Sequence, residues 1–363
     1  MSSKKTDSTE IFRPDGLSTL IGSIPTSDHK EALDLVFSHS PAIPLWPQLP
    51  GNPLEGMLSQ FIEGFPGITE KDGRTCFDTE STDFEQEHLA FFEDYLAVNQ
   101  DPALLENSRF KVSRERANGL YMLLDTVPKK ENIVALKGQI TGPFTLLTGL
   151  KDQNNRDAYY NPTLRELVLK GLSMKAAWQV KLLGKLNYPV IIFIDEPALA
   201  GLGSSSFISI SRDDISADQT EIINGIHEAG GLAGVHVCAN TDWPLLLSLN
   251  YDIINFDAFS FFDRFASSLN EIDNFLDRGG IIAWGIVPTS KEEDIISQDC
   301  GSLVSLWEKS AAALINDKRD IKGILRRSLI TPSCGTGSLS LENAGKVLEL
   351  TRDVSAELRS KYL

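Results

Sequence analysis

The chain has 363 residues, of which 42% are hydrophobic, and it carries a formal net charge of −16 at pH 7. A chain of this length can bury a large core, either as one big α/β barrel or as two ordinary domains. The acidic balance and the lack of a long run of Lys and Arg argue against nucleic acid as a partner. No stretch reaches the roughly 18 to 20 continuous apolar residues that cross a bilayer, so we expect a cytoplasmic protein with no membrane partner.

The N-terminal residues 1–16 are polar, and we expect them to form a flexible segment ahead of one catalytic domain over residues 17–363. The four cysteines of the chain are too few and too scattered for a disulfide framework. In a cytosolic protein, cysteines at special positions are more often metal ligands or nucleophiles than bridges.

Eight short apolar runs recur along the chain, each followed by a polar or glycine-rich turn and then by a segment of helical period. The predicted strands are residues 18–23, 41–46, 133–139, 189–196, 231–238, 252–258, 279–287 and 328–334. The predicted helices are residues 28–38, 53–63, 162–187, 215–229, 242–249, 267–277, 291–315 and 341–360. Apolar strands that alternate with helices are typical of a parallel sheet with a covered outer face. Eight such units predict a single closed (β/α)8 TIM barrel.

The stretch 64–130, between the second and third predicted strands, interrupts this alternation. Its Asp72-Gly73 pair, flanked by strand-like residues, predicts a β-hairpin, and further helical patterns follow. We interpret the stretch as an elaborated loop and helical layer on the barrel. A doubly wound open sheet is the rival fold, but no GxGxxG opens a helix after the first strand.

Polar residues close several predicted strands, at the ends where TIM barrels place their active sites. The fifth strand ends in His236-x-Cys238, the sixth carries Asp257 and the eighth ends at Cys334. Residues two apart on a strand face the same way, so His236 and Cys238 can reach one ion. A nitrogen, two thiolates and a carboxylate suit tetrahedral zinc, and we predict a Zn²⁺ site from these four residues. A histidine packed beside a buried cysteine is the alternative for His236 and Cys238 alone.

Asp195 and Glu196 follow the apolar run VIIFI and emerge at the same mouth. Such carboxylates can bind a substrate ammonium group, or one of them can act as an acid or base. A helix N-cap is the alternative role for the pair. Trp46 closes the second strand and could line the mouth, with rim packing as its alternative.

Together these residues resemble the catalytic barrel of cobalamin-independent methionine synthase, within the superfamily that includes uroporphyrinogen decarboxylase and the zinc-dependent corrinoid methyltransferases. The motifs LIGSIPTS, GQITGPFTLL, FIDEPAL, HVC and TPSCGTG occur in the family's order. The resemblance runs from about residue 17 to the C-terminus and covers the catalytic barrel only.

The resemblance implies a zinc-dependent methyltransferase that converts homocysteine to methionine. In that family the metal binds the thiol, lowers its pKa and presents it to a methyl donor, because a coordinated thiol is deprotonated and the thiolate is the nucleophile. By this matching His236, Cys238 and Cys334 are zinc ligands, and Asp257 stands where the family has a glutamate ligand.

The resemblance also implies a site for the amino-acid part of the substrate. Ser23, in the IGS segment, matches the residue that holds the carboxylate, and Asp195 matches the aspartate that takes the ammonium group. The predicted substrate-binding residues are Gly22, Ser23, Trp46, Glu63, Asp195 and Glu196, and the predicted catalytic residues are Asp195 and Asp257.

The seventh predicted strand departs from the folate-using members of the family. It carries Ala283, Trp284 and Gly285 where those enzymes have a histidine that protonates the leaving group. A methyl-corrinoid partner protein is therefore the expected donor in place of methyltetrahydrofolate, because cobalt(I) leaves without a proton. The alternatives are another acceptor thiol such as coenzyme M, or a uroporphyrinogen decarboxylase-like or ligand-binding barrel without zinc chemistry.

Overall fold

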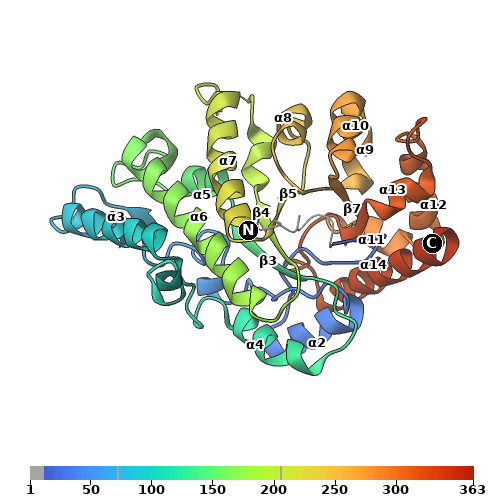
Figure 1. The fold of residues 1–363 in the computed structure, drawn as a ribbon, viewed down its shortest axis with the longest axis horizontal. Coiled ribbons are helices and arrows are strands. Elements are labelled where there is room, and N and C mark those ends of the chain that lie inside the picture. Colours follow the sequence, from blue (N-terminus) through green and yellow to red (C-terminus); the bar gives the residue numbers. More distant parts are fainter. Residues whose placement is uncertain (1–11, 72, 205–206) are drawn as a thin grey trace, which may run out of the picture.

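The computed structural model describes residues 12–71, 73–204 and 207–363 (Figure 1). Of the predicted flexible segment 1–16, residues 1–11 lie outside this range, whereas Phe12 is buried with 2% of its surface exposed. Within the described part of the chain, no helix is long and apolar enough to span a membrane.

Six parallel strands form a curled central sheet in the order β3-β4-β5-β6-β7-β8. They are β3 (Leu136–Thr141), β4 (Val190–Asp195), β5 (Leu232–Val237), β6 (Ile253–Phe256), β7 (Ile281–Val287) and β8 (Ser328–Pro332). Every residue of these strands is buried, which explains why β4 and β7 are near-continuous apolar runs. Because the strands are parallel, their carboxyl ends all lie at one edge of the sheet.

The first two predicted strands, residues 18–23 and 41–46, are not regular strands. Their segments make only isolated parallel bridges, which are Ser18–Ile330, Ser23–Gln48 and Leu45–Lys137. Pro41 and Pro44 interrupt the second segment, since a proline nitrogen carries no hydrogen for a ladder of hydrogen bonds. The two segments nevertheless run beside β8 and β3, the outermost strands of the six-stranded sheet.

The inner face of the curled sheet carries an apolar cluster separate from the larger core between sheet and helices. This inner cluster consists of Phe12, Leu17, Ile43, Ala135, Ile191, Phe193, Leu232, Ile253, Ile281, Ala283 and Leu329. Side chains two positions further along a strand face the same way. Polar residues therefore follow the inner cluster toward the carboxyl edge, among them Lys137, Asp195, His236 and Asn255.

Helices cover the outer face of the sheet, as Figure 1 shows. They are α2 (His29–His39), α5 (Pro143–Gly149), α6 (Pro162–Gly184), α7 (Arg212–Glu228), α8 (Trp243–Ser248), α9 (Ala258–Phe265), α10 (Leu269–Asp277), α11 (Glu292–Ser297), α12 (Cys300–Ala312), α13 (Ile321–Arg326) and α14 (Leu341–Tyr362). The short helices α5, α9 and α13 were not among the predicted ones, because six to eight residues give too little helical period to recognise.

Two predicted helices differ in the structure. The stretch 53–63 contains only the 3-10 turn Pro53–Glu55, because Gly56 adopts an extended conformation directly after it. The stretch 291–315 is divided into α11 and α12, because the Asp299 side chain accepts a hydrogen bond from the Ser302 N–H and starts a new helix.

Residues 64–130 form a hairpin and two longer helices beside the sheet. Strands β1 (Ile68–Lys71) and β2 (Arg74–Phe77) pair antiparallel, with Gly73 at a φ of +71° in the turn between them. Helices α3 (Phe84–Gln100) and α4 (Asn118–Thr126) follow, and α3 lies on the opposite side of the molecule from the C-terminus (Figure 1).

Candidate metal centre and thiol site

Four chemically active side chains lie at the carboxyl edge of the sheet. His236 lies near the end of β5 and Cys238 follows that strand directly, while Asp195 is the last residue of β4. Cys334 comes two residues after β8. The loops that leave three different strands thus bring residues far apart in the sequence to one place.

His236, Cys238 and Cys334 form a group that could hold a metal ion. Their ligand atoms all lie within 4.8 Å of one another, and all three residues are buried or half-buried. A tetrahedral zinc ion with two sulfur ligands and one nitrogen ligand places those atoms roughly 3.5 to 4 Å apart. The donor set and its spacing therefore fit zinc with a small contraction of the group.

The ring of His236 is oriented by Asn255, which lies opposite it on β6. The His236 Nδ1 atom faces the Asn255 Oδ1 atom, while the Asn255 amide donates to the Ala283 carbonyl oxygen at 2.9 Å and to the Thr331 hydroxyl at 2.8 Å. Both amide hydrogens are thereby used, so Oδ1 accepts and Nδ1 carries the proton. The other ring nitrogen, Nε2, is buried and has no hydrogen-bond partner. In the neutral ring this tautomer leaves Nε2 without a proton, which is the form of histidine that binds metals.

The two cysteines are coupled. A hydrogen bond from the Cys334 thiol, together with the neighbouring His236, lowers the pKa of Cys238 to about 4. The same hydrogen bond and burial raise the pKa of Cys334. Burial lowers the pKa of His236, but contact with Cys238 and the charge of Asp195 outweigh it and raise the pKa overall. Cys238 is therefore already a thiolate at neutral pH, and a bound cation would favour loss of the proton from Cys334 as well.

Asp257, the fourth predicted ligand, lies next to this group but is not one of its three members. Its Oδ1 atom accepts a hydrogen bond from the Ser260 N–H at 2.8 Å and caps α9. Burial raises the pKa of its carboxyl group, as does the charge of Cys238. Its carboxylate thus already has a role at a helix N-terminus.

Asp195 points into the interior beside His236, its partner in the β4–β5 register. Its Oδ1 atom is buried and has no hydrogen-bond partner. Burial raises the pKa of Asp195 to about 6, although His236 and Lys137 act in the opposite direction. Lys137, on β3, is fully buried, and burial lowers its pKa to about 8.

Gly22 and Ser23 lie beside the loop that carries Cys334. The Ser23 hydroxyl accepts a hydrogen bond from the Gly337 N–H at 3.2 Å, and the Ser23 carbonyl oxygen accepts one from the Thr336 N–H at 3.0 Å. A side chain at Gly335 would collide with the Ser23 hydroxyl, at 2.2 Å from a Cβ atom. The predicted carboxylate-binding segment is therefore adjacent to the candidate metal centre.

Glu196 follows Asp195 in sequence but faces the outer helices. Its carboxylate accepts hydrogen bonds from the N–H groups of Phe144 and Thr145, at 3.0 and 2.8 Å, and from the Thr145 hydroxyl at 2.6 Å. Gln219 of α7 donates a further bond at 2.6 Å. Glu196 therefore caps α5, and its placement does not support the predicted contact with substrate.

Trp46 and Glu63 also make contacts within the fold. Trp46 is fully buried, and its indole N–H donates to the Gln179 side chain on α6 at 3.0 Å. The Glu63 carboxylate accepts from the Ser113 N–H at 2.9 Å and lies 4.0 Å from the Arg116 guanidinium. These contacts give neither side chain a role at the carboxyl edge.

Three polar residues of the interior, Lys137, Gln139 and Asn255, were not predicted as site residues. Lys137 and Gln139 occupy alternate positions of β3, and Asn255 is the one polar residue of β6. A polar residue in a strand that is buried on both faces needs a partner inside the protein. This requirement is the feature of the sequence that could have identified the three residues as candidates.

The seventh predicted strand, β7, has no side chain that could donate a proton to the interior of the sheet. Ala283 belongs to the inner apolar cluster, and Gly285 packs so closely on Phe256 that a Cβ atom would lie 2.4 Å from its carbonyl oxygen. Trp284 points to the outer helices, where its ring stacks on Phe262, and its N–H donates to the Ser328 hydroxyl.

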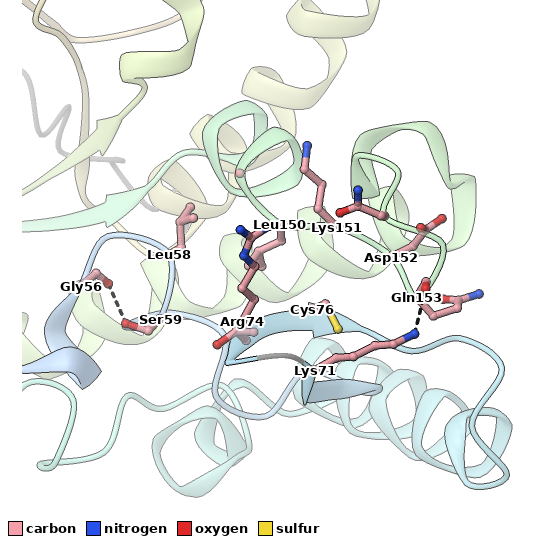
Figure 2. A pocket seen from close by; sticks show the side chains of 13 residues that line it. Gly56, Leu58, Ser59, Lys71, Arg74, Cys76, Leu150, Lys151, Asp152 and Gln153 are labelled. Carbon is pink, nitrogen blue, oxygen red and sulfur yellow. Dashed lines mark hydrogen bonds between the residues drawn. The ribbon is translucent and has the colours of Figure 1, made fainter.

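A hollow of about 910 Å³ lies away from these residues, between the hairpin β1–β2 and the segment 149–155 (Figure 2). The side chains of Lys71, Arg74 and Lys151 line it, and no predicted site residue does. The loop 56–59 forms one wall and also contacts the end of β3, since the Thr141 hydroxyl donates to the Met57 carbonyl oxygen at 2.6 Å.

Comparison with protein-family models and with curated proteins finds no match. Among solved structures, a Listeria monocytogenes protein described as a vitamin-B12 independent methionine synthase matches with a TM-score of 0.46 at 13% identity, over 67% of this chain and 69% of that chain. A catalytic module of the pneumococcal exo-β-D-N-acetylglucosaminidase matches with a TM-score of 0.46 at 10% identity, over 93% and 83% of the two chains. The β-mannanase of Alicyclobacillus acidocaldarius matches with a TM-score of 0.41 at 11% identity, over 98% and 100%. With TM-scores below 0.5, these matches support no choice among the activities.

Proposed function

We propose that this chain is a zinc-dependent methyltransferase that methylates a thiol, most simply homocysteine to methionine. The observation that carries the proposal is the meeting of His236 Nε2, which is buried without a partner, with the sulfur atoms of Cys238 and Cys334. A buried polar atom without a partner costs free energy, and a metal ligand role accounts for it. The catalytic domain would be residues 17–363, with the segments around 18–23 and 41–46 completing a (β/α)8 barrel.

Zinc bound at these three residues would lower the pKa of a coordinated substrate thiol and hold it as thiolate. Side chains around the three proposed ligands prepare them to bind the ion. Asn255 keeps the proton of His236 on Nδ1, and Cys238 ionises readily because Cys334 donates to its sulfur. Asp257, whose carboxyl group is influenced by Cys238 and His236, is the protein carboxylate we propose for a fourth position, and it would have to exchange its hydrogen bond with Ser260.

An amino-acid thiol fits the surroundings of this group. Asp195 presents an unpartnered carboxylate oxygen to the interior, where it can accept from an ammonium group. Ser23, which follows Gly22, borders the Cys334 loop, and we propose that this segment receives the substrate carboxylate. The thiol would then lie between them, at the metal centre.

The donor that fits best is a methyl-corrinoid protein. The substrate sulfur would attack the methyl carbon, a sulfur–carbon bond would form, and the bond from carbon to its carrier would break with the electron pair left on the carrier. Ala283 and Gly285 offer no proton to that leaving group. A carrier that leaves as cobalt(I) requires none, whereas a folate nitrogen does.

Two measurements test the proposal. The zinc content of the purified protein is expected to be one ion per chain, and transfer from methylcobalamin is expected with homocysteine as acceptor. Methyltetrahydrofolate should give no product, and coenzyme M should react much more slowly than homocysteine. A protein that stays free of metal after incubation with zinc would refute the proposal.

A further inference from the structure

A second hollow, of about 610 Å³, lies at the amino edge of the sheet, where the strands begin. Arg278 lies three residues before the start of β7, and Arg327 lies directly before the start of β8. The Gly16 N–H donates to the Ser328 carbonyl oxygen at 2.9 Å, which brings the segment that follows Arg13 to the same edge. We call this space the arginine hollow, after the four arginines that line it, Arg13, Arg278, Arg326 and Arg327. It lies at the opposite edge of the sheet from the candidate metal centre.

The four arginines of the hollow have no carboxylate partner. None of them forms an ion pair within the described part of the chain, whereas Arg165 and Arg319 each form two. The hollow also contains Asp15 and Asp277, but Asp277 already pairs with Lys318 and Arg319. Asp and Glu outnumber Lys and Arg by 50 to 34 in the chain, so a scarcity of carboxylates does not explain the four unpaired arginines. The hollow therefore has an excess of positive charge in an otherwise acidic protein.

Two of the guanidinium groups are held in place by backbone carbonyl groups. The Arg278 Nη2 atom donates to the Leu247 carbonyl oxygen at 2.8 Å, near the end of α8. The Arg327 Nη1 atom donates to the Gly279 carbonyl oxygen at 3.0 Å. Because a guanidinium group carries five N–H donors, both arginines keep donors that a ligand can use.

The other two arginines of the hollow, Arg13 and Arg326, form no side-chain hydrogen bond or ion pair within residues 12–71, 73–204 and 207–363. Arg326 is the last residue of α13, and a cation near a helix C-terminus is favourable by itself. That effect does not explain Arg13, which belongs to no helix. Four guanidinium groups in one hollow, from three separate segments, instead indicate a ligand with several negative charges.

We propose that the arginine hollow binds a small molecule that carries at least two linked phosphate groups. The planar guanidinium group pairs with phosphate through two parallel N–H···O bonds, a geometry that the lysine ammonium group cannot offer. A volume of about 610 Å³ is that of a small-molecule site and leaves room for more than one phosphate group. The proposal does not depend on the proposed function, because the hollow and the candidate metal centre lie at opposite edges of the sheet.

The first experiment is calorimetric titration of the full chain with inorganic phosphate, diphosphate and ADP, in about 0.15 M salt to screen weak surface binding. Diphosphate is expected to bind one molecule per chain, with a Kd roughly tenfold or more below that of inorganic phosphate, because two linked phosphate groups can pair with more guanidinium groups than one. A Kd for ADP below that for diphosphate would assign the remaining space to a nucleoside, and a higher Kd would assign the site to inorganic diphosphate. Both results support the site, whereas absence of saturable diphosphate binding would overturn it.

The second experiment locates the bound diphosphate. Arg13→Gln and Arg326→Gln each remove a guanidinium group that makes no contact with the fold, so the Kd for diphosphate should rise roughly tenfold in each while thermal unfolding without ligand stays unchanged. Arg264→Gln is the matched control, because Arg264 is also exposed, also lies in the last turn of a helix and also has no ion pair within the described residues, but is outside the hollow.

The original protein should bind diphosphate equally well with and without zinc, which distinguishes the hollow from binding of phosphate oxygens to the metal. An unchanged Kd in the double variant Arg13→Gln/Arg326→Gln would overturn the proposal. An equal loss of affinity in Arg264→Gln would do the same, since it would reveal only a general attraction between cations and anions.

Discussion

The Nδ1 atom of His236 faces the side-chain oxygen of Asn255, whose two amide hydrogens are taken by Ala283 and Thr331. The contact fixes the ring so that only Nε2 remains for a metal. Asn255→Ala should therefore weaken zinc binding by roughly 10- to 100-fold, the usual effect of removing a residue that orients a ligand. Competition with a coloured chelator measures this affinity.

Thr331→Val is the control for Asn255→Ala, because it removes one partner of the Asn255 amide and leaves the contact with His236 in place. It should lower zinc affinity far less than Asn255→Ala does. If both variants bound zinc as tightly as the original protein, Asn255 would have no part in orienting the ligand.

The cysteines of the candidate metal centre can be compared with a cysteine elsewhere in the chain. Cys334→Ala and Cys238→Ala should each reduce bound zinc to a small fraction of one ion per chain, because two protein ligands alone hold the ion weakly. Cys300→Ala, at the start of α12 and outside the group, should retain the metal. Metal analysis of the three purified variants measures the zinc content per chain. Full zinc content in Cys334→Ala would favour a barrel whose cysteines do not bind metal.

Much of the sheet was predictable because its strands are buried on both faces. Residues 189–196 and 279–287 read as apolar runs, and both became strands at nearly the predicted limits. The segment 41–46 has the same apolar character, yet its prolines restrict it to one isolated bridge with β3. Composition alone does not distinguish a strand from an extended segment that cannot form a ladder.

The grouping of the candidate ligands was predictable from residue type and place in the sequence. His236, Cys238 and Cys334 could be recognised as candidates because sulfur and imidazole bind metals and each residue lies at or just after the end of a strand. Glu196 shows the limit, since alternation along β4 turns it away from Asp195, and only the packed helices show what it contacts. The role of Asn255 depends on strands that meet only in the folded chain.

Glu196 and Asp195 are adjacent carboxylates with different surroundings, and substitution should separate their roles. Glu196→Ala leaves the N–H groups of Phe144 and Thr145 and the amide of Gln219 without an acceptor. At about 1–3 kcal/mol for each buried donor, the free energy of unfolding should fall by roughly 3 kcal/mol or more. Denaturant unfolding measures this loss.

The matched variant is Asp195→Asn, which should keep most of the stability and lose affinity for homocysteine. In Glu196→Ala, by contrast, the protein that remains folded should bind zinc and homocysteine normally. A Glu196→Ala protein that is as stable as the original and fails to bind homocysteine would restore Glu196 as a substrate contact.

Because of Lys175, on α6, the free energy of unfolding should increase as the pH rises above about 7. It is fully buried, its ammonium group donates to the Glu63 carbonyl oxygen at 2.6 Å, and burial lowers its pKa from 10.5 to about 7. Between these two values the unfolded chain holds a proton that the folded chain has released, so the contribution of Lys175 to stability rises with pH. From pH 7 to pH 9 the free energy of unfolding of the original protein should rise by about 2–3 kcal/mol, and that of Lys175→Met should not show this rise.

Urea unfolding at a series of pH values measures the difference between the two proteins. Lys181→Met, at an exposed position on the same helix, should follow the original protein, and parallel curves for the original protein and Lys175→Met would contradict the prediction.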